Sequence, residues 1–259
     1  MRRDAILSLQ SLSLQIADKR LCSQLSLSLQ AGTSLGILGR NGTGKTTLLH
    51  ALVRLHKPHS GHIRLADKPL EQWSQRELAC LAGILFQHNL DAMPISVGEL
   101  VLMGRHPHHT SFWNDSTEDK EAASAALTAM GMNDFARRQL STLSGGERQR
   151  VALAMLLCQN PRLYLLDEPS NHLDIAFQIR SLEIFQQKIR DNGAALCMAT
   201  HDINLAARFC DTVLLLLGDG HSLYGQTEQV LTETNLAKAY DCEIRKVSDG
   251  SGRNYFFPA

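Results

Sequence analysis

Hydrophobic residues recur along the first third of the chain in short runs separated by turns. AILSL, LSLSL and SLGIL either alternate with polar positions or run apolar, a pattern typical of strands. TTLLHALVRL then has helical spacing, and we expect this helix to stop before Lys57-Pro58. HIRLA and LAGILF predict further strands. The chain therefore opens with a strand-rich region that contains one early helix.

The pattern changes between about His88 and Leu140, where strand-like runs are scarce. TEDKEAASAALTAM predicts a helix with Ser116 or Thr117 as its N-cap, acidic residues in its first turn and Gly131 beyond its end. Strand-like runs return at LYLL, AALCMAT and VLLLL, with helical stretches between them. The simplest architecture is one α/β domain with a helical subdomain inserted in its middle.

Composition narrows the class of protein. The chain has 259 residues, of which 44% are hydrophobic, and its 26 basic and 26 acidic residues balance. This balance gives no general attraction to nucleic acid or to an anionic membrane. No apolar run approaches the length of a membrane span, and MRRDAILSLQ lacks a signal-peptide core. The six cysteines form no CxxC pair, so we expect reduced thiols in a cytoplasmic protein.

The stretch GRNGTGKT fits the phosphate-loop pattern G-x-x-x-x-G-K-[ST]. It follows the strand-like SLGIL and opens a helix, which is the context that the motif requires. Its glycines let successive backbone amides point at phosphate oxygens, while Lys45 adds a charge and the Thr46 hydroxyl can bind Mg²⁺. We therefore assign nucleotide binding to this stretch and the residue after it: Gly39, Arg40, Asn41, Gly42, Thr43, Gly44, Lys45, Thr46 and Thr47.

A second element is the acidic end of the run LYLLDEP. Four apolar residues predict a buried strand that delivers Asp167 and Glu168 at its carboxyl end, where α/β sheets keep their ligand sites. Asp167 can hold Mg²⁺ through water, and Glu168 can polarise an attacking water. Three polar residues near other strand ends complete the candidate site: Gln87 for Mg²⁺ or the water, His201 for the γ-phosphate, and Asp174.

The stretch STLSGGERQR, from Ser141 to Arg150, predicts a second anion site. Two glycines precede the apolar run VALAMLL, as at a helix whose first amides lie open. Such a helix end attracts anions through its unpaired N–H groups and its dipole. The sequence thus carries two phosphate-seeking helix ends.

The order GRNGTGKT, Gln87, LSGGE, LYLLDE, SNHLD and His201 resembles that of the ATP-binding subunits of ABC transporters, over essentially the whole chain. The resemblance implies a P-loop NTPase core with a RecA-like mixed sheet, an N-terminal antiparallel β-subdomain and an inserted helical subdomain. Residues 1–259 then form a single nucleotide-binding domain, with the helical subdomain at about 88–160. It also implies that ATP is hydrolysed with Mg²⁺ by Glu168, His201 and Gln87, and that Mg²⁺ is held by Thr46, Gln87 and Asp167.

In that family two subunits stack head to tail, and the LSGGE of one closes over the ATP of the other. The resemblance therefore implies that one set of residues acts in trans: Ser144, Gly145, Gly146, Glu147 and Asp174. This arrangement explains why one chain carries two anion sites, since each ATP needs one from each subunit.

Two segments narrow the choice within the family. ELVLMGRHPH, from Glu99 to His108, and the tail EQVLTETNLAKAYDCEI resemble subunits that import ferric siderophores, haem or cobalamin. Such a subunit lies on the cytoplasmic face of the bacterial inner membrane, with permease subunits and, indirectly, a periplasmic or lipoprotein substrate-binding protein as partners, and with no nucleic acid. Within the segment, Arg105 is expected at the permease contact. The histidines His106, His108 and His109 either bind metal or form a polar loop facing solvent or a membrane partner, and we favour the loop.

Three other functions stay open on the sequence. An ABC subunit for another small solute or for export differs only in ELVLMGRHPH and the tail. A soluble ABC ATPase of DNA repair or translation usually has a coiled-coil insertion, tandem units or a basic surface, none of which is seen in this sequence. A non-hydrolysing regulatory module is disfavoured by the presence of both Glu168 and His201.

The sequence departs from the family's pattern at three positions. Arg40 stands where proline is usual, which is expected to affect loop rigidity, and Glu147 replaces a more familiar glutamine. Ile16 stands where an aromatic residue commonly stacks on adenine. We therefore expect ATP to be distinguished only weakly from GTP, unless Leu14 or Trp73 supplies the contact.

Overall fold

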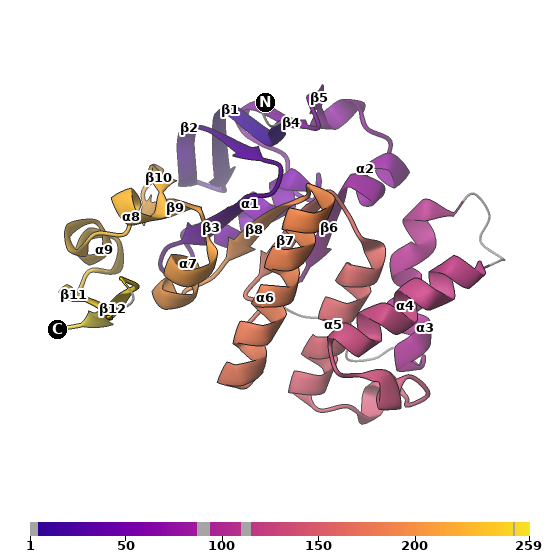
Figure 1. Cartoon of the computed structure of the whole chain (residues 1–259). Helices are drawn as coiled ribbons and strands as arrows, with labels where there is room; N and C mark the ends of the chain where they lie inside the picture. Colours follow the sequence, from indigo (N-terminus) through magenta and orange to yellow (C-terminus); the bar gives the residue numbers. More distant parts are fainter. Residues whose placement is uncertain (1–4, 87–93, 110–114, 251) are drawn as a thin grey trace.

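A six-stranded sheet forms the centre of the computed structural model, which describes residues 5–86, 94–109, 115–250 and 252–259 (Figure 1). Its strand order is β10-β9-β3-β8-β7-β6, in which neighbours from β9 to β6 run parallel and β10 is antiparallel to β9. The strands are β3 (Ser34–Leu38), β6 (Ala82–Leu85), β7 (Leu163–Asp167), β8 (Ala195–Ala199), β9 (Thr212–Gly218) and β10 (His221–Gln226). Strands β3, β7 and β8 are buried at every position, as expected of parallel strands covered on both faces.

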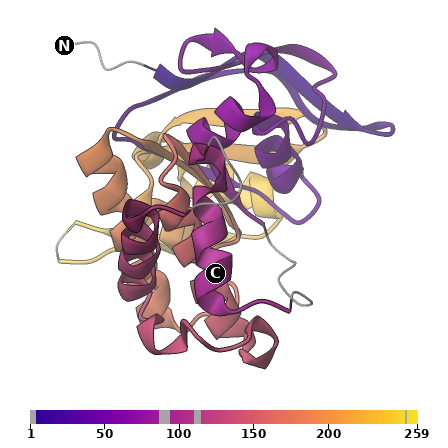
Figure 2. The same cartoon turned by 90° about the vertical axis from the view of Figure 1, so that its right-hand side faces the viewer.

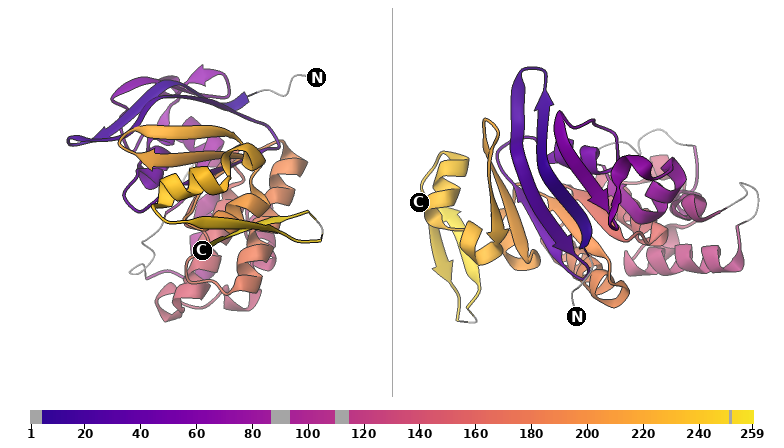
Figure 3. Two further views of the ribbon diagram at one scale, coloured as in Figure 1. Left: turned by 90° about the vertical axis from the view of Figure 1, so that its left-hand side faces the viewer. Right: turned by 90° about the horizontal axis from the view of Figure 1, so that it is seen from above.

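An antiparallel sheet of order β2-β1-β4-β5 lies over one face of the central sheet (Figure 3). Its strands are β1 (Ala5–Ile16), β2 (Lys19–Gln30), β4 (Ser60–Leu65) and β5 (Lys68–Pro69). Alternate leucines of β1 and β2 pack into one apolar core with helix α1 (Lys45–Leu52) and residues of β3, β7 and β8. The period-two pattern of the first third therefore builds the predicted N-terminal sheet.

Helices form the middle of the chain (Figure 2). Their buried side chains belong to a second apolar core. The helices are α3 (Val97–Leu102), the 3₁₀ segment η2 (Met103–His108), α4 (Thr117–Ala129) and α5 (Gly145–Gln159). This core also holds residues of β7, β8 and β9 and of α6 (Ile175–Asn192) and α7 (Ile203–Phe209). The helical block is thus continuous with the sheet's core, and the predicted boundary at residue 88 lies outside the described residues.

The last part of the chain forms a small unit on the side of the sheet opposite the helical block (Figures 1 and 3). It consists of α8 (Thr227–Val230), α9 (Glu233–Tyr240) and a hairpin of β11 (Ile244–Ser248) and β12 (Asn254–Pro258). Buried Leu236, Ile244 and Phe256 join it to the main core.

Local sequence signals explain where the helices begin. Ser116 caps α4 and shares a capping box with Asp119, which selects Ser116 over Thr117 as the predicted N-cap. The same reciprocal box begins α2 (Gln75–Leu81) at Ser74, α3 at Ser96 and α5 at Ser144. Serine followed three residues later by an acid therefore marks these helix starts.

Two predicted elements end earlier or start later than expected. Helix α1 stops at Leu52 because Arg54 adopts a left-handed conformation and the Leu55 amide bonds back to the His50 carbonyl, which closes the helix end. In LAGILF, Leu81 still belongs to α2 and only Ala82–Leu85 form the strand. Apolar periodicity located both elements but could not locate their ends.

Candidate functional site

The loop between β3 and α1 has the shape of a phosphate cradle. Gly39, Gly42 and Gly44 all have positive φ, and a Cβ on Gly44 would approach the Leu21 Cβ to 2.7 Å. The buried Lys45 ammonium donates to the Gly39 carbonyl at 2.8 Å. Burial lowers the pKa of Lys45, while the nearby carboxylates of Glu168 and Asp167 act in the opposite direction. The loop is therefore wound tightly around its own lysine.

A cavity of about 500 Å³ opens beside this loop. Its described lining is Ile16, Lys19, Leu21, Asn41, Gly42, Gly44, Lys45, Thr46, Thr47 and Glu168. Ile16, predicted at the base-stacking position, is 48% exposed and faces this cavity, whereas Leu14 is buried in the core. The Trp73 indole donates to the Leu65 carbonyl and does not line the cavity. The structure thus brings Ile16 to the phosphate loop and leaves both alternatives elsewhere.

Asp167 ends β7 close to the first turn of α1. Its carboxylate is buried, and neither oxygen has a hydrogen-bond partner within the described ranges. Burial raises the pKa of Asp167; the Thr46 hydroxyl is close enough to lower it but does not form a hydrogen bond of ordinary geometry. A buried, unpartnered carboxylate beside a hydroxyl is the oxygen set that Mg²⁺ takes, so these residues fit the metal.

Glu168 and His201 form a pair at the same edge of the sheet. Glu168 Oε2 lies 2.8 Å from His201 Nδ1, and the Glu168 amide donates to the Ala199 carbonyl at 2.9 Å. Glu168 has a φ of +49°, a conformation that costs a non-glycine residue energy and that clusters at functional sites. The adjacent strands β7 and β8 thus deliver two predicted catalytic residues together; the third, Gln87, lies outside the described residues.

The glycine pair Gly145-Gly146 begins α5, as predicted. This helix start lies apart from the described lining of the phosphate-loop cavity. Ser144 caps the helix, and its own amide donates to Glu147 Oε2 at 2.7 Å. A Cβ on Gly146 would approach the His172 carbonyl to 2.7 Å, so glycine is required there. None of the described residues that line the phosphate-loop cavity belongs to this helix start.

Asp174 joins the start of α5 to the start of α6. Its Oδ1 accepts from the Phe177 amide at 2.8 Å, and its Oδ2 lies 3.2 Å from Arg150 of α5. Gln149 of α5 donates to the Pro169 carbonyl at 3.2 Å. The loop after Glu168 is therefore fastened to the helix of the second anion site, and Asp174 groups with that site.

Comparisons with known proteins identify this constellation. The family model for ABC transporters matches residues 22–171. This chain belongs to the ABC transporter family. It is an ATP-hydrolysing subunit of the P-loop type, as its fold and motifs indicate.

Two curated proteins and one solved structure are similar to this ABC subunit over most of its length. The hemin import ATP-binding protein HmuV of Escherichia coli O157:H7 is 36% identical, over 94% of this chain and 95% of its own. The uncharacterized ABC transporter ATP-binding protein YvrA of Bacillus subtilis is 37% identical over 91% of this chain, which spans only 53% of that protein. A chain from the inward-facing structure of a transporter described as metal-chelate type superposes with a TM-score of 0.85 at 27% identity, covering 98% of both chains.

Sequence reasoning missed contacts that brace the phosphate loop of this ABC subunit from outside the motif. Lys19 Nζ donates to the Gly42 carbonyl at 2.9 Å. Tyr240, at the end of α9, has its hydroxyl buried beside the Gly39 backbone, and burial raises its pKa to about 12. Arg40, the residue in place of the usual proline, lies 3.7 Å from Asp241. Tyr240 and Asp241 lie some two hundred positions from the loop, and no spacing rule links residues so far apart.

The segment ELVLMGRHPH of the ABC subunit corrects one prediction. Arg105 is partly buried: it is paired with the buried Asp119 at 2.9 Å and donates to the Cys158 carbonyl at 3.2 Å. His109 lies 2.8 Å from the other Asp119 oxygen, and His108 contacts the Gln159 carbonyl at 2.8 Å. These side chains hold the helical block together, so His108 and His109 do not face solvent as expected, whereas His106 is exposed. Contact of this segment with a membrane partner stays a prediction.

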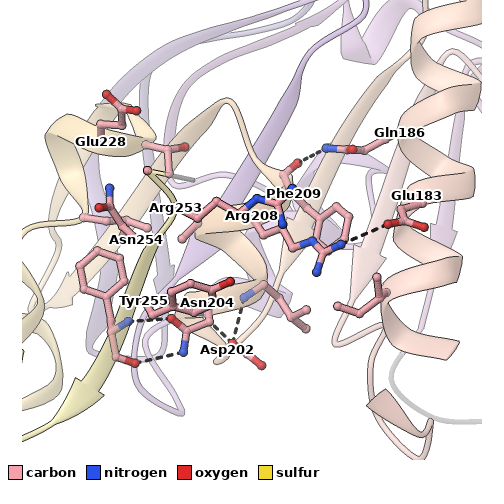
Figure 4. Close-up of a pocket in the computed structure, with 17 residues that line it drawn as sticks. Glu183, Gln186, Asp202, Asn204, Arg208, Phe209, Glu228, Arg253, Asn254 and Tyr255 are labelled. Atoms are coloured by element: carbon pink, nitrogen blue, oxygen red, sulfur yellow. Dashed lines mark hydrogen bonds and ion pairs between the residues drawn. The ribbon is translucent and has the colours of Figure 1, made fainter. Parts of the chain in front are cut away.

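A second cavity, of about 430 Å³, lies between α6, α7, α8 and the C-terminal hairpin (Figure 4). Asn204 of α7 exchanges two hydrogen bonds with the Phe256 backbone, at 3.0 and 2.8 Å, and Arg208 lies 3.2 Å from Glu183 (Figure 4). None of the predicted site residues that the structure describes lines this cavity. Its bonds tie the hairpin to α7, the helix that starts just after His201.

No helix within residues 5–86, 94–109, 115–250 and 252–259 is long and apolar enough to cross a membrane.

Proposed function

We propose that this chain powers the import of a metal chelate, such as a ferric siderophore or haem, or of cobalamin, from the cytoplasmic face of the bacterial inner membrane. The observation that carries this proposal is the end-to-end similarity to a hemin import ATP-binding protein, which covers 94% of this chain and 95% of that protein. The likeness to a metal-chelate type transporter supports it over 98% of both chains. A substrate-binding protein would choose the cargo and reach this subunit only through the permease.

Hydrolysis is assigned to the residues at the edge of β7 and β8. Mg²⁺ would be held by Asp167 and Thr46, together with Gln87, and when bound would offset charge on the nucleotide phosphates. Lys45 binds the β- and γ-phosphates, and the loop amides surround them. Glu168 Oε2 takes the proton from the attacking water as the water oxygen bonds to the γ-phosphorus and ADP leaves. His201, whose Nδ1 lies 2.8 Å from Glu168 Oε2, orients that carboxylate. When nucleotide is bound, His201 donates a hydrogen bond to the γ-phosphate.

A second copy of the chain is the proposed partner at each ATP. Ser144, Gly145, Gly146 and Glu147 begin a helix that lies apart from the phosphate-loop cavity of its own chain. Head-to-tail stacking would bring this helix start over the γ-phosphate of the partner. Asp174, fixed to Arg150, would follow α5 into the same interface. ATP then joins the two copies, and hydrolysis releases them.

A permease segment is the proposed occupant of an apolar groove of about 300 Å³ between α2, η2 and β6. Three large apolar side chains line it and are open to solvent: Leu55 at 57%, Phe86 at 46% and Met103 at 38%. Exposed apolar groups that gather in one groove are typical of a protein contact site. Among the described lining residues, only Met103, Gly104 and Pro107 come from ELVLMGRHPH, and we therefore propose this groove, in place of Arg105, as the contact.

Uptake measurements test the function. In cells that lack this subunit, the chain should restore ATP-dependent uptake of one labelled cargo among haem, ferric siderophores and cobalamin. Leu55→Asp should keep the ATPase of the isolated subunit and abolish uptake, whereas Val247→Asp, at an exposed position on the far hairpin, should leave both unchanged. Restored uptake of a different solute class with no response to these cargoes would refute the importer assignment.

A further inference from the structure

The turn that joins β1 to β2 carries a cation to the phosphate-loop cavity. Ile16 and Lys19 are paired across this tight turn, and both side chains line the cavity. Lys19 lies outside the phosphate-loop motif and comes from the N-terminal sheet, which packs firmly on the loop: Leu21 limits the space at Gly44. The same sheet that packs on the phosphate loop therefore carries Lys19 to the edge of the cavity.

The Lys19 ammonium has only one of its three protons committed by a described hydrogen bond. Its Nζ donates to the Gly42 carbonyl at 2.9 Å, and the rest of the exposed side chain borders the cavity. Lys45, by contrast, is buried under the loop and donates to the Gly39 and Arg40 carbonyls. The cavity thus has one lysine beneath the loop and another at its rim.

The charges around the cavity make the second lysine useful. Glu168 lines the cavity and Asp167 lies next to it, so two carboxylates oppose an incoming polyphosphate. Ile16 offers no ring to stack on a base, which leaves the phosphates to supply most of the binding. A rim ammonium with free protons provides attraction where a base contact is missing.

We propose that Lys19 is a phosphate-binding residue of this subunit, one that contacts the polyphosphate of the nucleotide while its bond to Gly42 holds the loop in position. This inference rests on the role of the Lys45 loop in nucleotide binding. In this chain the turn after β1 lacks an aromatic side chain. Its proposed role is electrostatic and does not depend on which base the nucleotide carries.

Calorimetric titration with ADP, GDP and inorganic pyrophosphate tests the proposal. Lys19→Met should raise the dissociation constant about tenfold for all three, because the lost contact is to phosphate and not to the base. Lys19→Arg, which keeps the charge, should stay within about threefold of the unmodified protein. Lys68→Met, a lysine of β5 that lies over the Trp73 ring, is the matched control and should change nothing. The tenfold difference should shrink at high salt, since the side chain is exposed.

Unchanged pyrophosphate binding in Lys19→Met, with a thermal unfolding midpoint like that of the parent, would overturn the proposal. Equal losses in Lys19→Arg and Lys19→Met would also overturn it, because the effect would not follow the charge. Lys45→Ala separates this result from the underlying assignment. If Lys45→Ala weakens ADP binding and Lys19→Met does not, only the Lys19 proposal fails; if neither variant matters, the phosphate-loop assignment fails with it.

Discussion

The helix starts at α1 and α5 look alike in sequence but are built in opposite ways. Gly44 begins α1 with no side-chain cap and no acid in the first turn, so the amides and the helix dipole remain available to a ligand. Ser144 begins α5 with a full capping box, and Glu147 places a negative charge in the first turn. Phosphate completes the first helix end, whereas the second is already largely satisfied.

This difference teaches which end can bind an anion alone. At α1 the cradle, the buried Lys45 and the rim Lys19 all converge on one cavity. At α5 a capped helix with a carboxylate in its first turn attracts an anion weakly. We infer that α5 acts on a phosphate only when another phosphate loop has already bound it, which is what a head-to-tail dimer would provide.

The largest effect is expected at the catalytic edge beside α1. Glu168→Gln keeps the size of the side chain and a hydrogen bond to His201 but cannot take a proton from water. We expect the rate of ATP hydrolysis to fall by about 10²- to 10⁴-fold, while ATP binding persists and holds two copies together. Steady-state ATPase assays and size-exclusion chromatography with ATP measure both. Glu183→Gln, at the Arg208 pair, is the control, and near-normal turnover in Glu168→Gln would remove Glu168 from the mechanism.

Mixed dimers test directly whether the helix starts of α1 and α5 act on one ATP from two different copies. Lys45→Ala disables the end at α1 and Ser144→Arg the end at α5, so each homodimer has no intact ATP site, whereas a mixed dimer has one. We expect ATP-dependent crosslinking across the interface to return only in the mixture.

A cap control is needed for that experiment, because loss of an N-cap serine costs about 1 kcal/mol by itself. Ser116→Ala removes the equivalent cap from α4 and should leave crosslinking intact. Crosslinking of Ser144 to nucleotide within its own chain would contradict the trans arrangement.

A stability measurement tests the corrected role of Arg105. Removing one partner of a buried ion pair costs about 3–5 kcal/mol; since Arg105 is partly exposed, we expect Arg105→Glu to destabilise the protein by about 3 kcal/mol. Urea unfolding followed by circular dichroism provides the value. Arg137→Glu, at an exposed position of the same helical block, should lie within about 0.5 kcal/mol of the parent. Equal unfolding midpoints for Arg105→Glu and Arg137→Glu would show that the Arg105–Asp119 pair does not stabilise the fold.

The smallest effect is expected at the base. Ile16 lacks the π-face that is worth about 1–3 kcal/mol in nucleic-acid binders, and none of the described residues lining the cavity is aromatic. GTP should therefore be hydrolysed within about tenfold of ATP, a difference of about 1.4 kcal/mol. Ile16→Tyr should lower the Michaelis constant for ATP with little change in turnover. Strong rejection of GTP by the parent, unaffected by Ile16→Tyr, would show that another residue reads the base.

Features made by residues close together in the chain could be predicted from the sequence, whereas contacts between distant residues could not. The phosphate loop, the acidic end of β7 and the cap of α4 are local patterns, since neighbours in the chain make the contacts. The Glu168–His201 pair was also within reach, because both residues follow strands that a parallel sheet aligns. Arg105 was misjudged because its partner Asp119 belongs to another helix, and neither residue signals the other through spacing. Tyr240 was missed for the same reason, at far greater distance along the chain.

The brace at Tyr240 and Asp241 has a consequence for synthesis of the protein. The helix end that packs against Gly39 and Arg40 is translated about two hundred residues after the phosphate loop. At about 5–20 residues per second, the nascent loop waits roughly 10–40 s for that support. The β8 and β9 strands that flank β3 are also translated late, so for most of that interval the described contacts available to the loop come from β1 and β2, including the bond from Lys19 to Gly42. The phosphate loop thus reaches its final packing only when α9, about two hundred residues further along, has been made.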